Sequence, residues 1–180
     1  EFERASAPAL RLLMVAHGGK GAAVKAGMLA AQGDLVVFAD ADLEQAAASA
    51  PYSVFDNAGQ DCCARSRILI ERSVYDRFVG LLVEATRGVN VGDPTDEATE
   101  MGPLTSALHR DRVLSYCKVA SEEGGQIITG GKAPSDAALS KGCYVEPTIV
   151  RAKPTDRVSQ EEVFGPFVTV TTFKTDEEAM

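Results

Sequence analysis

The sequence has no tryptophan, only two histidines and no apolar run long enough to cross a bilayer. The net charge of −8 argues against a nonspecific nucleic-acid-binding protein. The cysteines show no C-x-x-C spacing, and two histidines are too few for a usual zinc site. This cysteine usage predicts a reducing, cytoplasmic setting rather than a disulfide framework. The four cysteines are Cys62, Cys63, Cys117 and Cys143.

What the sequence does contain is typical of one globular domain. It has 180 residues, of which 45% are hydrophobic and 24% charged. This length and composition are sufficient for a sizeable core. We therefore expect a single α/β domain over residues 1–180.

The first quarter of the chain predicts a β-loop-α-β unit. Strands are expected over residues 9–16 and 35–39, with a glycine-rich turn at 18–21 and a helix over 22–31 between them. Asp40 and Asp42 follow the second strand. One interpretation is a nucleotide site, in which Lys20 and the turn hold a diphosphate and the two carboxylates bind Mg²⁺ or Mn²⁺. The other is a loop followed by a helix that Asp42 caps together with Gln45.

Two runs of this segment carry a family resemblance. H-G-G-K-G-A-A-V-K-A-G-M at residues 17–28 and G-D-L-V-V-F-A-D-A-D at 33–42 resemble family 2 glycosyltransferases of the dolichyl-phosphate sugar transferase kind. The resemblance covers about residues 10–43, and in that family both motifs belong to a nucleotide-sugar site. It implies that residues 1–43 are a glycosyltransferase-like segment.

A second set of motifs begins with F-D-N-A-G-Q-D-C-C at residues 55–63. A cysteine at such a turn can be an exposed nucleophile, although burial as a small apolar side chain is commoner. M-G-P-L at 101–104, Y-V-E-P-T at 144–148 and E-E-V-F-G-P at 161–166 follow in order. Together these motifs resemble the catalytic domain of the aldehyde dehydrogenase family over roughly residues 36–180.

The second resemblance implies specific roles. Cys62 matches the nucleophile that attacks the aldehyde, and its backbone N–H matches half of the oxyanion hole. Glu162 matches the carboxylate that binds the nicotinamide ribose of NAD or NADP, and Phe164 matches the aromatic neighbour of that site. The implied partners are a small-molecule aldehyde and further copies of the chain in a homo-oligomer.

The same resemblance exposes two departures. The family's general-base glutamate falls on Met28 in register through Phe38–Leu43, or on Ala16 if residues 18–20 are the family's G-G-K. Loss of that base is expected to slow thioester hydrolysis by about two to four orders of magnitude. The family's NAD-binding Rossmann domain also lies upstream of the matched region. We therefore expect no NAD-dependent oxidation by these 180 residues alone.

The two resemblances together predict a chimera. We expect a three-layer, open, mostly parallel sheet like that of the aldehyde dehydrogenase catalytic domain, over residues 44–180, with a glycosyltransferase-type β-loop-α-β unit before it. Three functions remain open on the sequence. They are an aldehyde-dehydrogenase-like domain centred on Cys62, a nucleotide-sugar and metal-binding module, and a chimera without activity.

Overall fold

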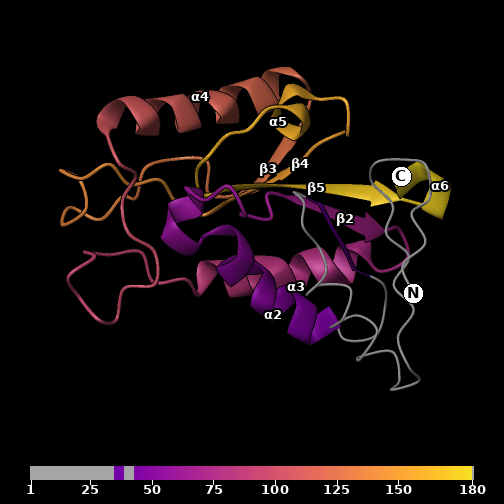
Figure 1. Cartoon of the computed structure of the whole chain (residues 1–180), viewed down its shortest axis with the longest axis horizontal. Coiled ribbons are helices and arrows are strands. Elements are labelled where there is room, and N and C mark those ends of the chain that lie inside the picture. Colours follow the sequence, from indigo (N-terminus) through magenta and orange to yellow (C-terminus); the bar gives the residue numbers. More distant parts are fainter. Residues whose placement is uncertain (1–34, 39–42, 180) are drawn as a thin grey trace, which may run out of the picture.

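The structure, a computed structural model, describes residues 35–38 and 43–179 and forms a three-layer α/β fold (Figure 1). A five-stranded sheet has the order β1-β2-β5-β4-β3. Helices α2 and α3 cover one face, and α4 with the short α5 covers the other (Figure 1). The strands are β1 (Leu35–Phe38), β2 (Arg67–Glu71), β3 (Gln126–Thr129), β4 (Thr148–Arg151) and β5 (Phe167–Phe173). The helices are α2 (Leu43–Val54), the 3-10 turn η1 (Asp56–Gly59), α3 (Tyr75–Arg87), α4 (Ala107–Glu122), α5 (Arg157–Gln160) and α6 (Asp176–Ala179).

The sheet is mostly parallel, as expected from the sequence. Strands β1, β2, β5 and β4 run parallel, and only the edge strand β3 is antiparallel to its neighbour β4. Strand β1 pairs with β2 over its whole length, from Leu35 beside Arg67 to Phe38 beside Ile70. The segment before the Cys62 turn therefore contributes a strand to the same sheet as the segments after it.

Burial along the strands follows their place in the sheet. In β2, Ile68 and Ile70 are buried and alternate with half-buried residues. Strand β5 is central and buried at six of its seven positions, which is the pattern of a strand covered on both faces. These strands and the inner faces of α2, α3 and α4 form one continuous hydrophobic core.

Two element boundaries differ from what local spacing predicts. The capping-box spacing of Ser73 and Asp76 predicts a capped start for α3, but the Ser73 hydroxyl donates to Glu71 and no side chain caps the helix. The run over residues 144–150 predicts a strand with an interrupted edge, and β4 begins only at Thr148. Pro147 has no N–H to donate to a ladder, and the Glu146 N–H instead donates to Lys132 O at 2.9 Å.

The topology brings two distant motifs to one edge of the sheet. Four residues separate the G-Q-x-C turn from the start of β2, and the E-E-V-F-G-P segment immediately precedes β5. Because β2 and β5 are adjacent and parallel, with Arg67 beside Thr169, both segments lie at the amino edge of the sheet. Within the described ranges, no helix is long and apolar enough to cross a membrane.

Several sequence predictions lie outside the described residues. They are the strand over 9–16, the turn over 18–21, the helix over 22–31, and the candidate ligands Lys20, Asp40 and Asp42.

Candidate active site

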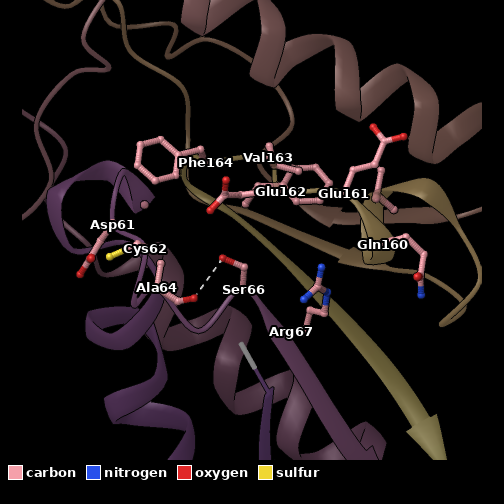
Figure 2. A pocket seen from close by; sticks show the side chains of 13 residues that line it. Asp61, Cys62, Ala64, Ser66, Arg67, Gln160, Glu161, Glu162, Val163 and Phe164 are labelled. Carbon is pink, nitrogen blue, oxygen red and sulfur yellow. Dashed lines mark hydrogen bonds between the residues drawn. The ribbon is translucent and has the colours of Figure 1, made fainter. Parts of the chain in front are cut away.

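A cleft of ≈ 240 Å³ opens at the amino edge of β2 and β5 (Figure 2). Residues from both motif segments line it, although about a hundred positions separate them in the chain. Cys62 comes from the turn before β2, and Glu162 and Phe164 come from the segment before β5. The structure therefore brings together all three of the residues that the second resemblance singled out.

A left-handed turn positions Cys62. Asn57, Ala58 and Gly59 have φ values of 51°, 55° and 67°, a conformation that costs roughly 1–2 kcal/mol for each residue with a Cβ. Local hydrogen bonds compensate this cost. Asp56 Oδ1 accepts from the Asn57 N–H at 2.9 Å, and Asn57 Nδ2 donates to Gln60 O at 3.0 Å. The turn follows α2 and directs the residues after it toward the cleft.

Gln60 anchors this turn to the M-G-P-L segment. Its side-chain Oε1 accepts from the Thr105 N–H at 2.9 Å. Its Nε2 donates to Asn57 O at 3.0 Å and reaches Pro103 O at 3.5 Å. One side chain therefore joins two of the sequence motifs by satisfying backbone groups in both.

On the opposite wall of the cleft, Phe164 has a left-handed backbone conformation. Its φ is 56°, and the residue is 36% exposed. His109 Nε2 lies 2.6 Å from Phe164 O, and the two rings are tilted with centroids 6.3 Å apart. Ser106 caps the start of α4 by accepting from the His109 N–H at 3.2 Å. His109 therefore ties the first turn of α4 to the strained Phe164.

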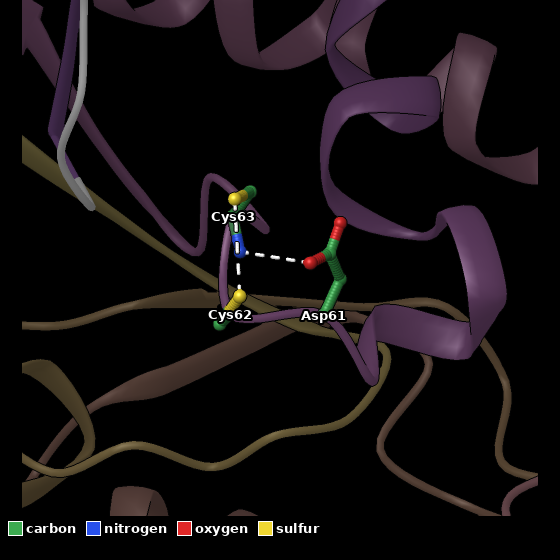
Figure 3. Close-up of side chains that lie close together, drawn as sticks. All are labelled: Asp61, Cys62 and Cys63. Atoms are coloured by element: carbon green, nitrogen blue, oxygen red, sulfur yellow. Dashed lines mark hydrogen bonds between the residues drawn. The ribbon is translucent and has the colours of Figure 1, made fainter.

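Cys62 and Cys63 are both exposed, and their sulfurs lie 3.9 Å apart (Figure 3). The Asp61 carboxylate accepts from the Cys63 N–H at 2.9 Å, which holds all three side chains on one tight turn. Cys63 first, through its hydrogen bond and charge, and then the Asp61 carboxylate raise the pKa of the Cys62 thiol. An exposed thiol is thus present, but these neighbours oppose the lowered pKa that a nucleophilic thiol requires.

Glu161 and Glu162, side by side in sequence, have different environments. Glu161 accepts from Tyr116 Oη at 2.9 Å and from Arg157 at 3.0 and 3.2 Å. Its hydrogen bonds, to Arg157 first, lower the pKa of its carboxyl. Glu162 is exposed, its backbone O accepts from Arg112 at 3.2 Å, and its carboxylate makes no hydrogen bond or ion pair within the part of the chain described. The Glu161 carboxylate is engaged by Tyr116 and Arg157, whereas the Glu162 carboxylate faces the cleft (Figure 2).

A family comparison decides between the two resemblances. The model of the aldehyde dehydrogenase family matches residues 7–180. The chain belongs to the aldehyde dehydrogenase family. The betaine aldehyde dehydrogenase of Bacillus subtilis (strain 168) is 45% identical over 146 residues, which are 81% of this chain and 30% of that protein. The betaine aldehyde dehydrogenase of Brucella ovis is 42% identical over 154 residues, with 84% and 31% covered.

Solved structures agree in fold and sequence. PnpE from Pseudomonas sp. WBC-3 superposes with a TM-score of 0.78 at 54% identity, covering 81% of this chain and 30% of that one. Betaine aldehyde dehydrogenase from Staphylococcus aureus, solved in complex with NAD⁺, gives a TM-score of 0.77 at 42% identity, with 81% and 29% covered. The chain thus spans about 30% of the relatives that it matches.

The glycosyltransferase resemblance and the chimera find no support. The family match begins at residue 7, so it includes the segment that the sequence assigned to another family. A glycine-rich turn, a small-residue helix and a strand ending in carboxylates make a unit that many doubly wound sheets share, so the motif does not discriminate between them. The comparisons likewise give no support for Mg²⁺ or Mn²⁺ at Asp40 and Asp42.

The sequence did not reveal the residues that fix the backbone around the cleft, as distinct from those that line the cleft. Gln60 was noted only as part of a motif, and His109 was not noted at all. Both act through backbone groups of residues more than forty positions away, which periodicity and local spacing do not reveal. The one local signal was Ser106 three residues before His109, which has the spacing of an N-cap.

Proposed function

We propose that this chain supplies the nucleophile and part of the cofactor contact of an NAD(P)-dependent aldehyde dehydrogenase. The observation that carries the proposal is the meeting of Cys62, Glu162 and Phe164 around one cleft at the amino edge of the sheet. A shared cleft places a thiol, a carboxylate and an aromatic ring where one bound substrate and one cofactor can reach them.

In the proposed reaction, the exposed Cys62 thiol gives its proton to solvent water, and its sulfur then adds to the aldehyde carbonyl carbon. A carbon–sulfur bond forms, and the electron pair of the carbonyl π bond moves to oxygen. The Cys62 N–H makes no hydrogen bond within the described part of the chain, so it is available to donate to that oxygen. The charge that develops on oxygen is the one that such a donor stabilises.

Glu162 and Phe164 fit the cofactor side of the site. The Glu162 carboxylate faces the cleft without a partner in the described chain, which suits an acceptor for two ribose hydroxyls. When bound there, NAD(P)⁺ would supply the hydride acceptor for the oxidation. Phe164 offers an exposed ring on a backbone that His109 fixes, so this wall of the cleft is preorganised before any ligand binds.

Full oxidation is proposed to need more than these 180 residues, because they span about 30% of their relatives. Incubation of the chain with NAD(P)⁺ and aldehydes is expected to give no NADH or NADPH. Robust formation of either would contradict this part of the proposal.

Aldehyde binding at Cys62 can be tested without the cofactor. An aldehyde that adds to the thiol blocks alkylation, so labelling of Cys62 by iodoacetamide should slow in a saturable way. The panel should contain betaine aldehyde, because three of the relatives described above are betaine aldehyde dehydrogenases, together with an aromatic and a short aliphatic aldehyde. Peptide mapping separates Cys62 from Cys63. Labelling of Cys62 that no aldehyde slows, or equal slowing at Cys63 in a Cys62→Ser variant, would overturn the assignment.

A further inference from the structure

We propose that Asp61, Cys62 and Cys63 form a binding site for one thiophilic divalent cation, Zn²⁺ or its heavier analogue Cd²⁺. The three side chains each offer one ligand atom, and these atoms all lie within 4.8 Å of one another (Figure 3). The site rests on this geometry and not on the proposed function of Cys62.

The sulfur separation matches a chelate. Two thiolates about 2.3 Å from a tetrahedral zinc ion lie roughly 3.8 Å apart. The Cys62 and Cys63 sulfurs are 3.9 Å apart, so both can bind one ion with little movement of the turn. A disulfide requires the sulfurs to approach to about 2.05 Å, which demands a much larger rearrangement.

The hydrogen bonds of the turn orient the three ligand residues before any metal binds. Asp61 Oδ1 accepts from the Cys63 N–H at 2.9 Å, and the Ala64 N–H donates to Asp61 O at 3.1 Å. These bonds fix the relative orientation of three consecutive residues, and the carboxylate keeps further lone pairs for a metal. Two sulfurs and one oxygen form a donor set that suits zinc and cadmium better than the hard cations Mg²⁺ and Ca²⁺.

All three residues are exposed, so the fourth coordination position is open to water or another ligand. On binding, each thiol releases its proton to the buffer while its sulfur joins the metal. A metal on the Cys62 sulfur occupies the lone pair that attacks an aldehyde. Under the proposed function, the same ion is therefore a reversible inhibitor of the nucleophile.

Calorimetry and native mass spectrometry with the 180-residue chain test the site, using Cd²⁺ and Zn²⁺ alone as probes. We expect saturable binding of one ion per chain and, with Cd²⁺, ultraviolet absorption from cadmium–thiolate charge transfer. Cys63→Ser and Cys62→Ser should each weaken binding roughly 100-fold or more, because each removes a ligand. Asp61→Asn should weaken it about 10-fold, since the amide keeps the turn but loses the charge.

Cys143→Ser is the matched control, because Cys143 is a partly exposed cysteine outside the turn. It should bind the ion as tightly as the parent chain. Binding that Cys63→Ser leaves unchanged, one ion shared by two chains, or no saturable binding at micromolar metal would overturn the proposal. Circular dichroism of each variant shows whether it is folded, and all three ligand residues are on the surface. Metal binding without any aldehyde protection of Cys62 would separate this site from the proposed function.

Discussion

Gly59 lies against the backbone of Gly165 so closely that a Cβ on Gly59 would meet Gly165 O at 2.0 Å. This contact joins the turn that presents Cys62 to the segment that presents Phe164. Gly165 in turn leaves room for Val113 of α4, whose Cγ2 lies 2.5 Å from where a Gly165 Cβ would be. Two glycines therefore allow the Cys62 turn, the Phe164 segment and α4 to pack closely against one another.

Gly59→Ala is expected to lower the free energy of unfolding by about 3 kcal/mol. The substitution adds a Cβ at a φ of +67° and a clash with a backbone oxygen, which cannot move like a flexible side chain. Gly80→Ala is the control, because nothing lies within 4 Å of its Cβ position in the exposed face of α3. It should stabilise the chain by about 0.5–1 kcal/mol. Urea denaturation of both variants measures the difference, and equal effects would contradict the account.

Gln60→Ala is expected to cost about 1 kcal/mol and to expose the Thr105 amide to exchange with solvent. The side-chain oxygen of Gln60 is the acceptor for that amide, at 2.9 Å. Gln60→Glu keeps the acceptor and loses the Nε2 donor to Asn57 O. Hydrogen exchange at Thr105 should therefore accelerate in Gln60→Ala and change little in Gln60→Glu. The same acceleration in both variants would show that the Oε1 bond does not protect this amide.

Cys117 should make stability fall between about pH 9 and 11. Burial raises the pKa of its thiol from 9.0 to about 11 in the folded chain. In that window the unfolded thiol loses its proton while the folded thiol keeps it, so the free energy of unfolding falls by about 1.4 kcal/mol per pH unit. Cys117→Ala removes this contribution. Denaturation of both proteins from pH 8 to 11 gives the difference, and parallel curves would contradict the expectation.

The thiol pKa of Cys62 should fall in two variants. Cys63→Ala removes its hydrogen-bond partner, the largest cause of the raised pKa, and Asp61→Asn removes a nearby negative charge. Iodoacetamide labelling of Cys62 as a function of pH, with a chelator present, reports the thiolate fraction. We expect both midpoints to move to lower pH, more in Cys63→Ala. The midpoint of Cys62 labelling should not move in a Cys143→Ser control. Unchanged midpoints in Cys63→Ala and Asp61→Asn would show that Cys63 and Asp61 do not raise the pKa of Cys62.

The sequence predicted the mostly parallel sheet and three residues that line the cleft. It did not predict the residues that hold the walls of the cleft in place. The motif order predicted the family, and the strand expected over residues 35–39 is present as β1 over Leu35–Phe38. The glycosyltransferase interpretation arose from residues 17–42, where one β-loop-α-β pattern serves many nucleotide-binding folds. The contacts of Gln60 with Thr105 and of His109 with Phe164 depend on tertiary structure, so no local pattern could predict them. The raised pKa of Cys62 likewise depends on the distance between two adjacent side chains.

We expect Cys62, and not Cys63, to be the nucleophile of this cleft. An activated ester such as p-nitrophenyl acetate tests it most directly, because attack by a thiolate forms an acyl thioester and releases p-nitrophenolate. Intact-mass analysis and peptide mapping should find one acetyl group, on Cys62, in the parent chain and in Cys63→Ser. Cys62→Ser should release no p-nitrophenolate burst. Acetylation of Cys63 with Cys62 unmodified, or an undiminished burst in Cys62→Ser, would contradict the account.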